Sequence, residues 1–589
     1  MNANTESSAS ERPSRVRHGI VFVTFLAAFL LYLHRFCMTY AQRYVKEDLG
    51  LTDDHLGYCF SAFFFAYALG QVPSGWLSDR FGARKMLALY ILTWSFFTAL
   101  MGLTMGFVML LAVRLAAGLG QAGAYPTSCG LLANWVPFRS RAWASSIVAF
   151  GGRFGGGLAP LLTVTMIVAF VPLSVPSDLG EDDLLDRAVL ARAMTAANVS
   201  PTRQQTDSDV DAAKILLRRR VFGQMSGDVK EAFRAFPETD LINGEAFADQ
   251  LLLDINSVIR GPQLIRETQT PIPLEREATQ LLRQTELTQA QTERLNRLIL
   301  EAVFPDSIRK IYVHGWRPVM FVYGAMGIVV ALLFWGLFRN SPSAHPLCNK
   351  SEQALIETGR PARSQKEQGP ARSENKQADV GRVPIEHILC SRSLWLMCVS
   401  QWGSNVGWVF LVTWLPRYLL EVHSAPLWQQ GWMTALPLWA GWIGMLAGGR
   451  LSDAAVRRMG LRWGRLAPLT VGKFLAAGAY LLCLFHPSAW MITGIFAIVA
   501  FSTDMGSAGG WAYKQDVGGR HVASIHGWAN MWGNLGATVS PVLLQVIIRN
   551  FGWDAAFLSC SIAFAIAGAA AIGVDASIPI VPDNTARDS

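Results

Sequence analysis

The chain has 589 residues, of which 51% are hydrophobic and 16% are charged, and its mean hydropathy is +0.27. A soluble domain of this length would not show that balance, so lipid surrounds most of the chain and a wholly soluble protein is excluded. The formal net charge of +8 indicates no nucleic-acid partner, because the excess of Lys and Arg falls in short loops on one side of the predicted membrane.

Apolar stretches long enough to cross a bilayer, which takes roughly 20 residues, recur along the chain. They predict an all-α membrane protein with twelve transmembrane helices, placed at about 19–41, 56–78, 84–106, 108–133, 142–170, 316–338, 392–420, 428–451, 465–486, 489–513, 522–548 and 553–575. The first stretch is too long for the core of a signal peptide and lacks a small-residue cleavage site, so we expect it to be retained.

Lys and Arg residues in the short loops predict the orientation of the chain in the membrane. Most of them fall on the N-terminal side: Arg80, Arg84, Lys85, Arg139, Arg141, Arg457, Arg458, Arg462, Arg465, Lys514 and Arg520. The opposite loops and helix ends hold fewer: Arg43, Lys46, Arg417 and Arg549. We therefore expect a bacterial inner-membrane protein with both termini in the cytoplasm.

Two halves of the chain repeat each other. Gly75-Trp-Leu-Ser-Asp79 recurs 374 residues later as Gly449-Arg-Leu-Ser-Asp453. Four more residues, Arg139, Gly152, Gly155 and Pro160, recur at an offset of 381 as Arg520, Gly533, Gly536 and Pro541. Gly315-Trp316, in contrast, recurs as Gly552-Trp553 after only 237 residues. The difference between 381 and 237 predicts an insertion of about 144 residues between the fifth and sixth helices.

The spans and the repeat divide the chain into seven segments: a cytoplasmic tail (1–18), helices one to five (19–170), an extracytoplasmic helical insertion (171–314), helix six (315–339), a flexible cytoplasmic linker (340–391), helices seven to twelve (392–575) and a cytoplasmic tail (576–589). Helical spacing of apolar residues over 184–194 and 281–298 predicts several short helices in the insertion, interrupted at Thr270-Pro271-Ile272-Pro273. We expect a passive structural domain rather than one that captures substrate or binds a partner.

Eight cysteines are present, and none of them lies in the insertion or has the spacing of a metal site. We interpret them as small apolar fillers of helices or as reduced cytoplasmic thiols. The sequence therefore predicts no disulfide framework, no metal and no cofactor, and no motif in it has the spacing of a catalytic site.

A charged motif connects the second and third predicted helices: Gly75-Trp-Leu-Ser-Asp79-Arg80-Phe-Gly82-Ala-Arg84-Lys85. A basic loop that only obeys the topology rule would not require glycines and an aspartate at fixed offsets. The motif resembles the signature of the major facilitator superfamily, whose fold is two six-helix halves. That resemblance implies a latch for the outward-facing state, in which a carboxylate meets a basic side chain and a neighbouring helix terminus. The latch residues would be Gly75, Asp79, Arg80, Gly82, Arg84, Lys85, Asp453 and Arg458.

Within the superfamily the chain resembles the anion:cation symporter family, whose members carry organic anions, sugar acids among them. The resemblance covers all twelve predicted helices and rests on Tyr32-Leu-His34-Arg35, Gly70-Gln71-Val-Pro73-Ser-Gly75-Trp76, Gly118-Leu-Gly-Gln121-Ala-Gly-Ala-Tyr125-Pro126, Asn405-Val-Gly407-Trp408, Thr413-Trp414-Leu415-Pro416 and Asp516-Val-Gly518-Gly519-Arg520. It implies a secondary active transporter of a small organic anion, working by alternating access and coupled to a proton or a sodium ion. We expect a monomer in the lipid bilayer.

Arg35 is the first candidate for substrate binding. A charge this far inside an apolar helix costs on the order of 3 kcal/mol unless it faces a wet cavity or a partner. The resemblance implies that Arg35 binds the substrate anion, and its planar guanidinium suits a carboxylate. The alternative is that the side chain extends to the outer interface, which lies a couple of turns away.

Two further arginines lie within predicted helices. Arg153, in a run of glycines, either contacts substrate or braces two helices by bonding their carbonyls. Arg114 resembles the arginine of the superfamily's fourth-helix motif, and we expect it to brace. Uncharged polar side chains at membrane depth suit substrate hydroxyl groups, although any one of them can instead bond a neighbouring helix. These side chains are Tyr32, Tyr67, Gln71, Gln121, Asn405, Asn530 and Asn534.

The residues expected to couple transport to protons differ from those of the family that this chain resembles. Members of that family commonly carry an aspartate just before the first-helix arginine and a glutamate in the fourth helix. Here those positions hold His34 and Gln121, and Gln121 cannot take up a proton. His34 either replaces the aspartate, since imidazole titrates near pH 6.5, or is a neutral histidine bonded to a neighbouring helix. Asp504 in the tenth helix is the other coupling candidate, unless it is only the structural partner of a nearby donor.

Two other functions stay open. An exchanger of organophosphates would need two arginines converging on a phosphate; Arg35 and Arg153 can supply them, but the centre of the seventh helix holds no arginine. A receptor that signals through the insertion without transporting anything would need neither the latch nor the polar side chains at membrane depth.

Overall fold

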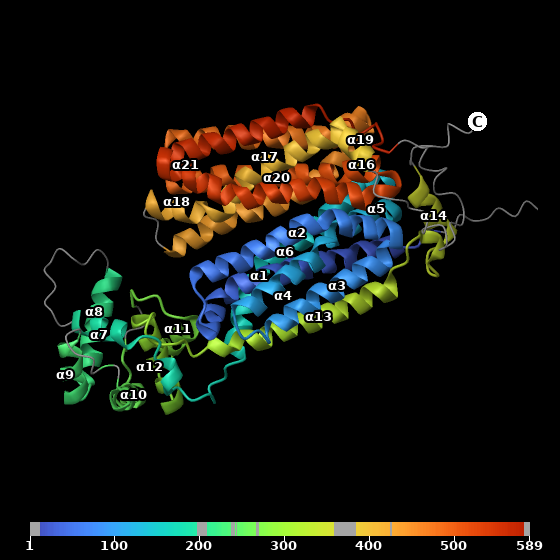
Figure 1. Cartoon of the computed structure of the whole chain (residues 1–589). Coiled ribbons are helices and arrows are strands. Elements are labelled where there is room, and N and C mark those ends of the chain that lie inside the picture. The colour runs from blue at the N-terminus through green and yellow to red at the C-terminus, as the bar shows by residue number, and fades with distance from the viewer. Residues whose placement is uncertain are drawn as a thin grey trace, which may run out of the picture. The chain divides into compact units, whose positions relative to one another are not determined.

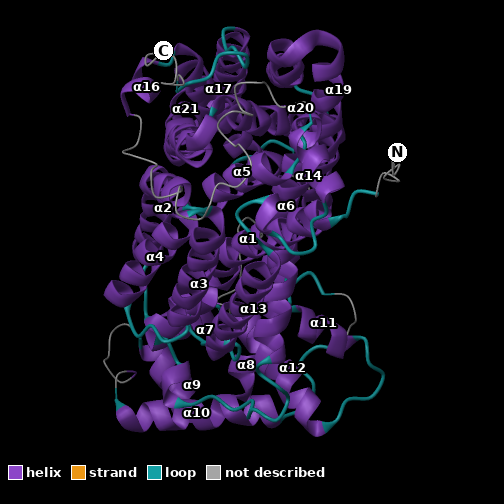
Figure 2. Cartoon of the chain, turned by 90° about the vertical axis from the view of Figure 1, so that its right-hand side faces the viewer, coloured by secondary structure: helices purple, strands orange, loops and turns teal. Residues whose placement is uncertain are grey.

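A computed structural model describes residues 12–196, 209–236, 242, 244–266, 270–358, 385–423 and 427–581. Apart from an isolated bridge between Leu184 and Ile308, every regular element in these ranges is a helix (Figure 2). The all-α fold predicted from the sequence is therefore confirmed. The chain divides into two compact units, one formed by Met1–Thr39, Asp53–Pro160 and Met320–Ser589, the other by Tyr40–Thr52 and Leu161–Val319.

The first half of the first unit is built on the helices coloured blue to cyan in Figure 1. It also includes α13, which comes much later in the chain. The helices of this half are α1 (Val16–Leu49), α2 (Asp53–Phe81), α3 (Ala83–Met101), α4 (Phe107–Ala122), α5 (Ala124–Trp135), α6 (Arg141–Ala169) and α13 (Trp316–Leu337). Helices α4 and α5 follow each other around Gly123 and together occupy the fourth predicted span.

The second half of the same unit is the orange-to-red bundle of Figure 1. It contains α17 (Arg392–Thr413), α18 (Leu415–Glu421), α19 (Leu427–Leu482), α20 (Ala489–Val517) and α21 (Val522–Ile572). Helices α19 and α21 are each broken by one glycine, Gly460 with φ 76° and Gly552 with φ 82°. Residues with a Cβ rarely adopt this left-handed backbone, so each glycine lets the chain end one helix and start the next.

Eight helical stretches of the described residues are long and apolar enough to cross a membrane. Two of them, Gly431–Phe485 and Gly519–Ile572, contain the glycine breaks and therefore hold two helices each. Helices α3 and α17 lie outside this apolar set and occupy the third and seventh predicted spans. The helices thus follow the predicted order, while the number of twelve crossings stays a prediction.

The second unit is built on short helices: α7 (Arg187–Ala196), α8 (Asp209–Gln224), α9 (Gly227–Ala235), α10 (Glu245–Arg260), α11 (Arg276–Leu282) and α12 (Gln289–Val303). Their apolar faces are buried, for example at Phe233, Leu251 and Leu298. The proline-rich connector 270–273 is not helical. Helix α7 begins only at Arg187, because Leu184, which we expected in a helix, bridges to Ile308 instead.

The second unit is larger than the expected insertion 171–314, because it includes the last part of α1. That helix continues to Leu49 rather than ending near residue 41. Its acidic end is bonded within the unit: the Lys310 N–H donates to Glu47 Oε2 at 3.2 Å, and Arg317 Nε donates to Asp48 Oδ2 at 2.7 Å. The extra turns of α1 are therefore fixed by charged side chains that the apolar pattern does not reveal.

The expected flexible linker 340–391 is ordered at its start. It forms a short 3-10 helix at Pro342–Ala344 and α14 (Lys350–Glu357), and α16 (Ile385–Cys390) precedes α17. Glu352 of α14 accepts hydrogen bonds from the N–H groups of Val16 and Arg17 at 3.1 and 3.2 Å and thus caps α1. The remainder of the predicted linker, residues 359–384, lies outside the described residues.

Candidate functional site

Asp79, at the end of α2, caps the start of α21. Its carboxylate accepts hydrogen bonds from the N–H groups of Ala523 and Ser524 at 3.1 and 2.8 Å and from Ser524 Oγ at 2.6 Å. The positive end of the helix dipole also stabilises a carboxylate at this position. Close approach of the two helices requires Gly75, since a Cβ there would lie 2.4 Å from the Ala523 carbonyl oxygen. The predicted contact between the aspartate and a helix terminus is therefore present between the two halves.

The basic residues of the same motif bond elsewhere. Arg84 donates from Nη2 to the Trp335 carbonyl at 2.9 Å, and Asn340 Oδ1 accepts from the Arg84 N–H at 2.9 Å. Gly82 has a φ of 88°, with Asn340 packed where a Cβ would lie. The Arg80 guanidinium lies 5.2 Å from the centre of the Trp76 ring, and Lys85 is exposed at the start of α3. Arg84 thus holds the α2–α3 connection against α13 and against Asn340, which follows that helix.

Asp453 repeats the arrangement in the second half. It accepts from the N–H groups of Ala142 and Trp143, at the start of α6, at 3.2 and 2.8 Å. Arg465 Nη1 donates to the same carboxylate at 2.6 Å. Arg458, which we expected among the latch residues, is exposed. The arginine that meets the carboxylate is therefore Arg465, one helix further along the chain.

Arg465 belongs to a larger ion-pair network at this end of the bundle, which we call the latch end. Its Nε lies 2.8 Å from Asp516 Oδ2, and Arg141 Nη1 lies 2.8 Å from the other oxygen of Asp516. Arg465 and Asp516 have fully buried side chains. Helices α6, α19 and α20 are thus joined by four alternating charges: Arg141, Asp516, Arg465 and Asp453.

Arg35 of α1 is 7% exposed and lies among aromatic and amide side chains. Its Nε donates to Gln121 Oε1 at 3.2 Å, and its guanidinium carbon lies 4.1 Å from the centre of the Tyr67 ring and 4.9 Å from that of Tyr32. The buried Nη2 atom has no hydrogen-bond partner among the described residues. The structure therefore brings three other predicted residues, Gln121, Tyr67 and Tyr32, around the Arg35 guanidinium, which has a free donor.

A chain of amide groups crosses between the halves beside this cluster. Asn530 Nδ2 of α21 donates to Gln71 Oε1 of α2 at 2.6 Å, and Gln401 Nε2 of α17 donates to Asn530 Oδ1 at 3.0 Å. Lys514 Nζ of α20 donates to Gln401 Oε1 at 3.3 Å. Gln71 and Asn530 were predicted from the sequence, whereas Gln401 and Lys514 were not.

Arg153 and Asp504 form a second bridge between the halves. Arg153 Nη2 of α6 lies 2.9 Å from Asp504 Oδ1 of α20, and the Arg153 guanidinium lies 4.2 Å from the centre of the Trp408 ring. Each of the two residues is therefore the charged partner of the other. Arg153 thus links α6 to α20 through a carboxylate rather than through carbonyl oxygens, and its role in substrate binding stays a prediction.

The remaining candidates contact neighbouring helices rather than the Arg35 guanidinium. His34 is 1% exposed and packs on Tyr323 of α13, with ring centres 5.7 Å apart. Asn405 and Asn534 donate to the carbonyls of Gly533 and Asn530 at 2.6 and 2.7 Å, so both bond the α21 backbone. Arg114 is buried, lies 4.3 Å over the Phe63 ring and donates to the Cys59 carbonyl at 3.5 Å, which fits the expected bracing role.

Sequence reasoning missed two buried lysines in the second half. Lys473 and Lys514 are 5% and 3% exposed. Lys473 Nζ donates to the Ser400 carbonyl at 3.2 Å and to Ser404 Oγ, both on α17. Lys473 could have been found as a charge within a predicted span. Lys514 was counted among the loop residues, because it lies one residue beyond the predicted end of its helix at 513.

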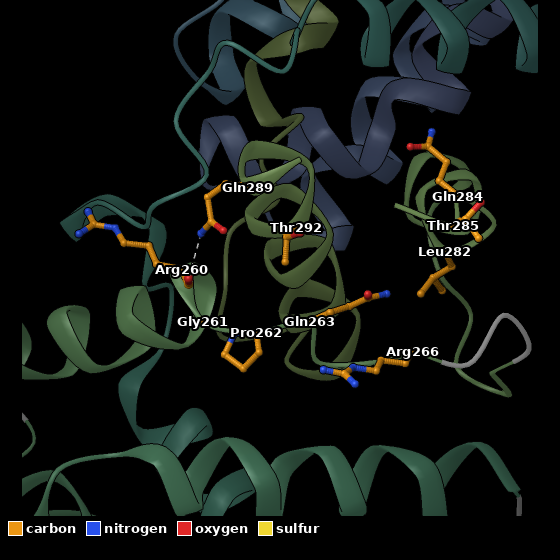
Figure 3. A pocket seen from close by; sticks show the side chains of 10 residues that line it. All are labelled: Arg260, Gly261, Pro262, Gln263, Arg266, Leu282, Gln284, Thr285, Gln289 and Thr292. Carbon is orange, nitrogen blue, oxygen red and sulfur yellow. Dashed lines mark hydrogen bonds between the residues drawn. The ribbon is translucent and has the colours of Figure 1, made fainter. Parts of the chain in front are cut away.

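The described part of the second unit has a hollow of about 670 Å³. Figure 3 shows its lining: Arg260, Gly261, Pro262, Gln263, Arg266, Leu282, Gln284, Thr285, Gln289 and Thr292. Arg260 is already paired, with Nε 3.1 Å from Asp178 Oδ1, and Arg266 is exposed. The described lining of this surface hollow therefore holds no buried cation with an unsatisfied donor, which is what Arg35 provides in the first unit.

The two halves of this helical bundle repeat each other. They meet through capped helix ends at one end and through buried polar side chains further in. This is the architecture of a membrane transporter. The chain belongs to the Major Facilitator Superfamily, whose sequence model matches residues 21–174 and 311–458. It is accordingly a multi-pass membrane transporter and not an enzyme.

Relatives with known names agree with the narrower resemblance. The chain is 24% identical over 551 residues to the probable galactarate/D-glucarate transporter GudP of Bacillus subtilis (strain 168), covering 92% of this chain and 88% of the relative. It is 24% identical over 577 residues to the probable sulfoacetate transporter SauU of Cupriavidus necator, covering 96% and 94%. Both names describe transporters of organic anions.

A solved structure supports the fold alone. The human organic anion transporter MFSD10 (TETRAN) aligns with a TM-score of 0.53 at 12% identity, over 95% of this chain and 100% of that chain. At this identity the likeness extends to the arrangement of helices and not to the residues of the site.

Proposed function

We propose that this transporter moves a small organic anion, a sugar acid or another carboxylate, across the membrane by alternating access. The observation that supports this best is Arg35, a buried guanidinium with no carboxylate partner among the described residues and with one donor nitrogen unsatisfied. A planar guanidinium can hold a carboxylate through two parallel hydrogen bonds. Tyr67 and Gln121 beside it can hydrogen-bond the substrate's hydroxyl groups.

The contacts at the latch end support alternation between two states. Asp79 and Asp453 each cap a helix of the opposite half, so these bonds close that end of the bundle. Opening the latch end would break both caps together with the Arg141–Asp516 pair. The closed arrangement then corresponds to the outward-facing or occluded state, with the latch end on the cytoplasmic side.

Transport is coupled to a proton or a sodium ion in this proposal, and Asp504 is the better placed of the two coupling candidates. Its ion pair with Arg153 links the halves, so a conformational change that separates them would free the carboxylate to bind a cation. His34 packs instead on α13 within its own half. The protein would act as a monomer in a bacterial inner membrane, with both termini in the cytoplasm and the insertion outside.

The phosphate exchanger and the non-transporting receptor are weaker alternatives. A phosphate site built from Arg35 and Arg153 would have to displace Asp504 from Arg153. A receptor has no use for two helix caps that must break and form together.

Uptake by proteoliposomes tests the proposal. Purified protein should accumulate or exchange labelled sugar acids or other small carboxylates, and unlabelled carboxylates should compete with that uptake. Phosphate esters presented in the same assay test the exchanger. Uptake of phosphate esters but of no carboxylate would replace this proposal with the exchanger, and uptake of neither class would favour the receptor.

A further inference from the structure

Two buried cations lie beside the contact between the halves without a carboxylate partner among the described residues. Arg35 in the first half is one, and Lys514 in the second half is the other. The buried arginines that link the halves are paired: Arg153 with Asp504, and Arg141 and Arg465 with Asp516. Arg35 and Lys514 are therefore available to an anion that comes from outside the protein.

Lys514 lies deep in the bundle rather than at its surface. Its ammonium reaches Gln401, which is nine residues into α17 and therefore about 14 Å from the start of that helix. An ammonium that is 3% exposed, and whose bond within the described residues is to an amide oxygen at 3.3 Å, is poorly compensated. Burying a charge in this way costs several kcal/mol, which a bound anion would offset.

Hydrogen-bonding side chains connect the two cations. From Lys514 the chain runs through Gln401 to Asn530, and from Asn530 to Gln71 in the other half. Tyr67, four residues before Gln71 on the same helix, carries the Arg35 guanidinium over its ring. The amide and phenol groups between the cations offer both donors and acceptors, as a hydroxylated molecule requires.

From this arrangement we infer that Lys514 is a second anion-binding residue of the transport site. The preferred substrate then has a negatively charged group at each end, with hydroxyl groups between them: one end binds Arg35 in the first half and the other binds Lys514 in the second half. The inference rests on the proposed function and adds to it the charge of the substrate. Such a molecule would also attract the two halves toward each other, because it carries a counter-charge for each.

Lys473 provides a matched control. It is also a buried lysine of the second half, but it bonds Ser400 and Ser404 of α17 and takes no part in the chain of amides between the halves. Replacing either lysine by methionine removes one buried positive charge and keeps the length of the side chain. A general effect of lost charge or altered packing would therefore affect both variants alike.

The experiment compares a pair of competitors in proteoliposome uptake. One is a hydroxylated six-carbon dicarboxylate, and the other is the monocarboxylate in which one end is reduced to a primary alcohol. The parent should bind the dicarboxylate at least about tenfold more tightly, a gain typical of one buried charge contact. Lys514→Met should lose that preference while its affinity for the monocarboxylate changes by less than about threefold. Lys473→Met should keep the preference, and Lys514→Arg should retain part of it.

Each contrary result has its own meaning. A parent that takes up carboxylates without preferring the dicarboxylate overturns this inference alone, and a parent that takes up neither overturns the proposed function as well. If Lys514→Met keeps the preference but loses accumulation driven by a pH gradient, Lys514 carries a proton and the inference is wrong. Should Lys514→Met fail to fold, thermal stabilisation of purified Lys514→Gln by the two acids provides the same comparison without reconstitution.

Discussion

At the scale of single residues, the shape of the Arg35 guanidinium matters as much as its charge. The side chain bonds Gln121 through Nε and lies flat over Tyr67, which leaves the other edge of its planar fork for a carboxylate. An ammonium presents no such fork and does not stack in the same way.

Arg35→Lys should therefore lose most of the substrate affinity, by about tenfold or more, although the charge is kept. The measurement is the half-saturation concentration of uptake in proteoliposomes. Arg114→Lys is the control, because the Arg114 guanidinium lies over the Phe63 ring and bonds the Cys59 carbonyl. That variant should keep half-saturation within about threefold of the parent. Transport by Arg35→Lys at the parental rate and half-saturation would remove Arg35 from the site.

The coupling group is the second question at this scale. Asp504→Asn keeps the shape of the side chain and removes its charge, so we expect uphill accumulation to be lost. Exchange of labelled for unlabelled substrate should persist, because exchange needs no net movement of a coupling ion. His34→Gln should behave like the parent, since His34 packs on α13.

The reverse result, with accumulation lost in His34→Gln and kept in Asp504→Asn, would assign the coupling to the histidine. If both variants still accumulate substrate in response to an imposed pH gradient, neither residue carries the proton. A parent that ignores the pH gradient is a facilitator, an exchanger or a sodium-coupled carrier.

At the scale of helices, the latch end depends on one buried arginine that touches two carboxylates. Arg465 bonds Asp453 at 2.6 Å and Asp516 at 2.8 Å, with none of its side chain exposed. Removing one partner of a buried ion pair leaves an uncompensated charge, which costs about 3–5 kcal/mol.

Arg465→Met should accordingly lower thermal stability in detergent far more than Arg458→Met, whose parent side chain is exposed. We expect the Arg458 variant to stay within about 0.5 kcal/mol of the parent, as is usual for surface positions. Thermal unfolding of the two purified variants measures the difference. Equal losses of stability would show that Arg465 is not the residue that holds Asp453 in place.

The start of α1 is held by α14, and this contact depends on pH. Burial acts to raise the pKa of Glu352, but hydrogen bonds from Ser14, Arg17 and Val16 outweigh it, so the pKa lies below its usual value of 4.5. Because the folded-state pKa is depressed, the carboxylate stabilises the fold above about pH 4.5, and this contribution is lost as the pH falls through the folded-state pKa.

Glu352→Gln should therefore lower thermal stability at pH 7.5, by roughly the 0.5–2 kcal/mol of a lost helix cap. The gap between variant and parent should shrink as the pH falls below 4.5, where the parent's carboxylate becomes protonated. Glu357→Gln, at an exposed position of the same helix, is the control and should match the parent at every pH. A gap of constant size between pH 7.5 and pH 4 would contradict the role of the charge.

At the scale of the whole molecule, orientation in the membrane is open to direct test. Cys390 is exposed, and the other seven cysteines are buried, so the parent offers one native site for a thiol reagent. Ala290→Cys adds an exposed site on α12 of the insertion, three residues from Glu293.

In intact cells a membrane-impermeant reagent should label the cysteine at position 290 and spare Cys390. Permeabilised cells should show labelling at both positions. Labelling of Cys390 alone in intact cells would mean that the insertion faces the cytoplasm, and the predicted orientation would be wrong.

The sequence by itself determined the class of fold and the order of the helices. Apolar stretches and paired offsets depend only on the chemistry of neighbouring residues, and lipid requires each crossing segment to satisfy its own backbone. The Gly75 and Asp79 motif predicted the contact of α2 with a helix terminus for the same reason, since a close helix approach and a capping carboxylate are local requirements. Arg35 stood out because a charge within an apolar helix is expensive wherever the helix lies.

Only the tertiary structure decided which charges meet. Arg153 and Asp504 are 351 residues apart in the chain, and Gln71 and Asn530 are separated by 459. Lys514 looked like a loop residue until the last turns of α20 placed its ammonium against Gln401. Partners of this kind depend on how helices from different halves are rotated against each other, and that rotation is set by the packing of many side chains at once.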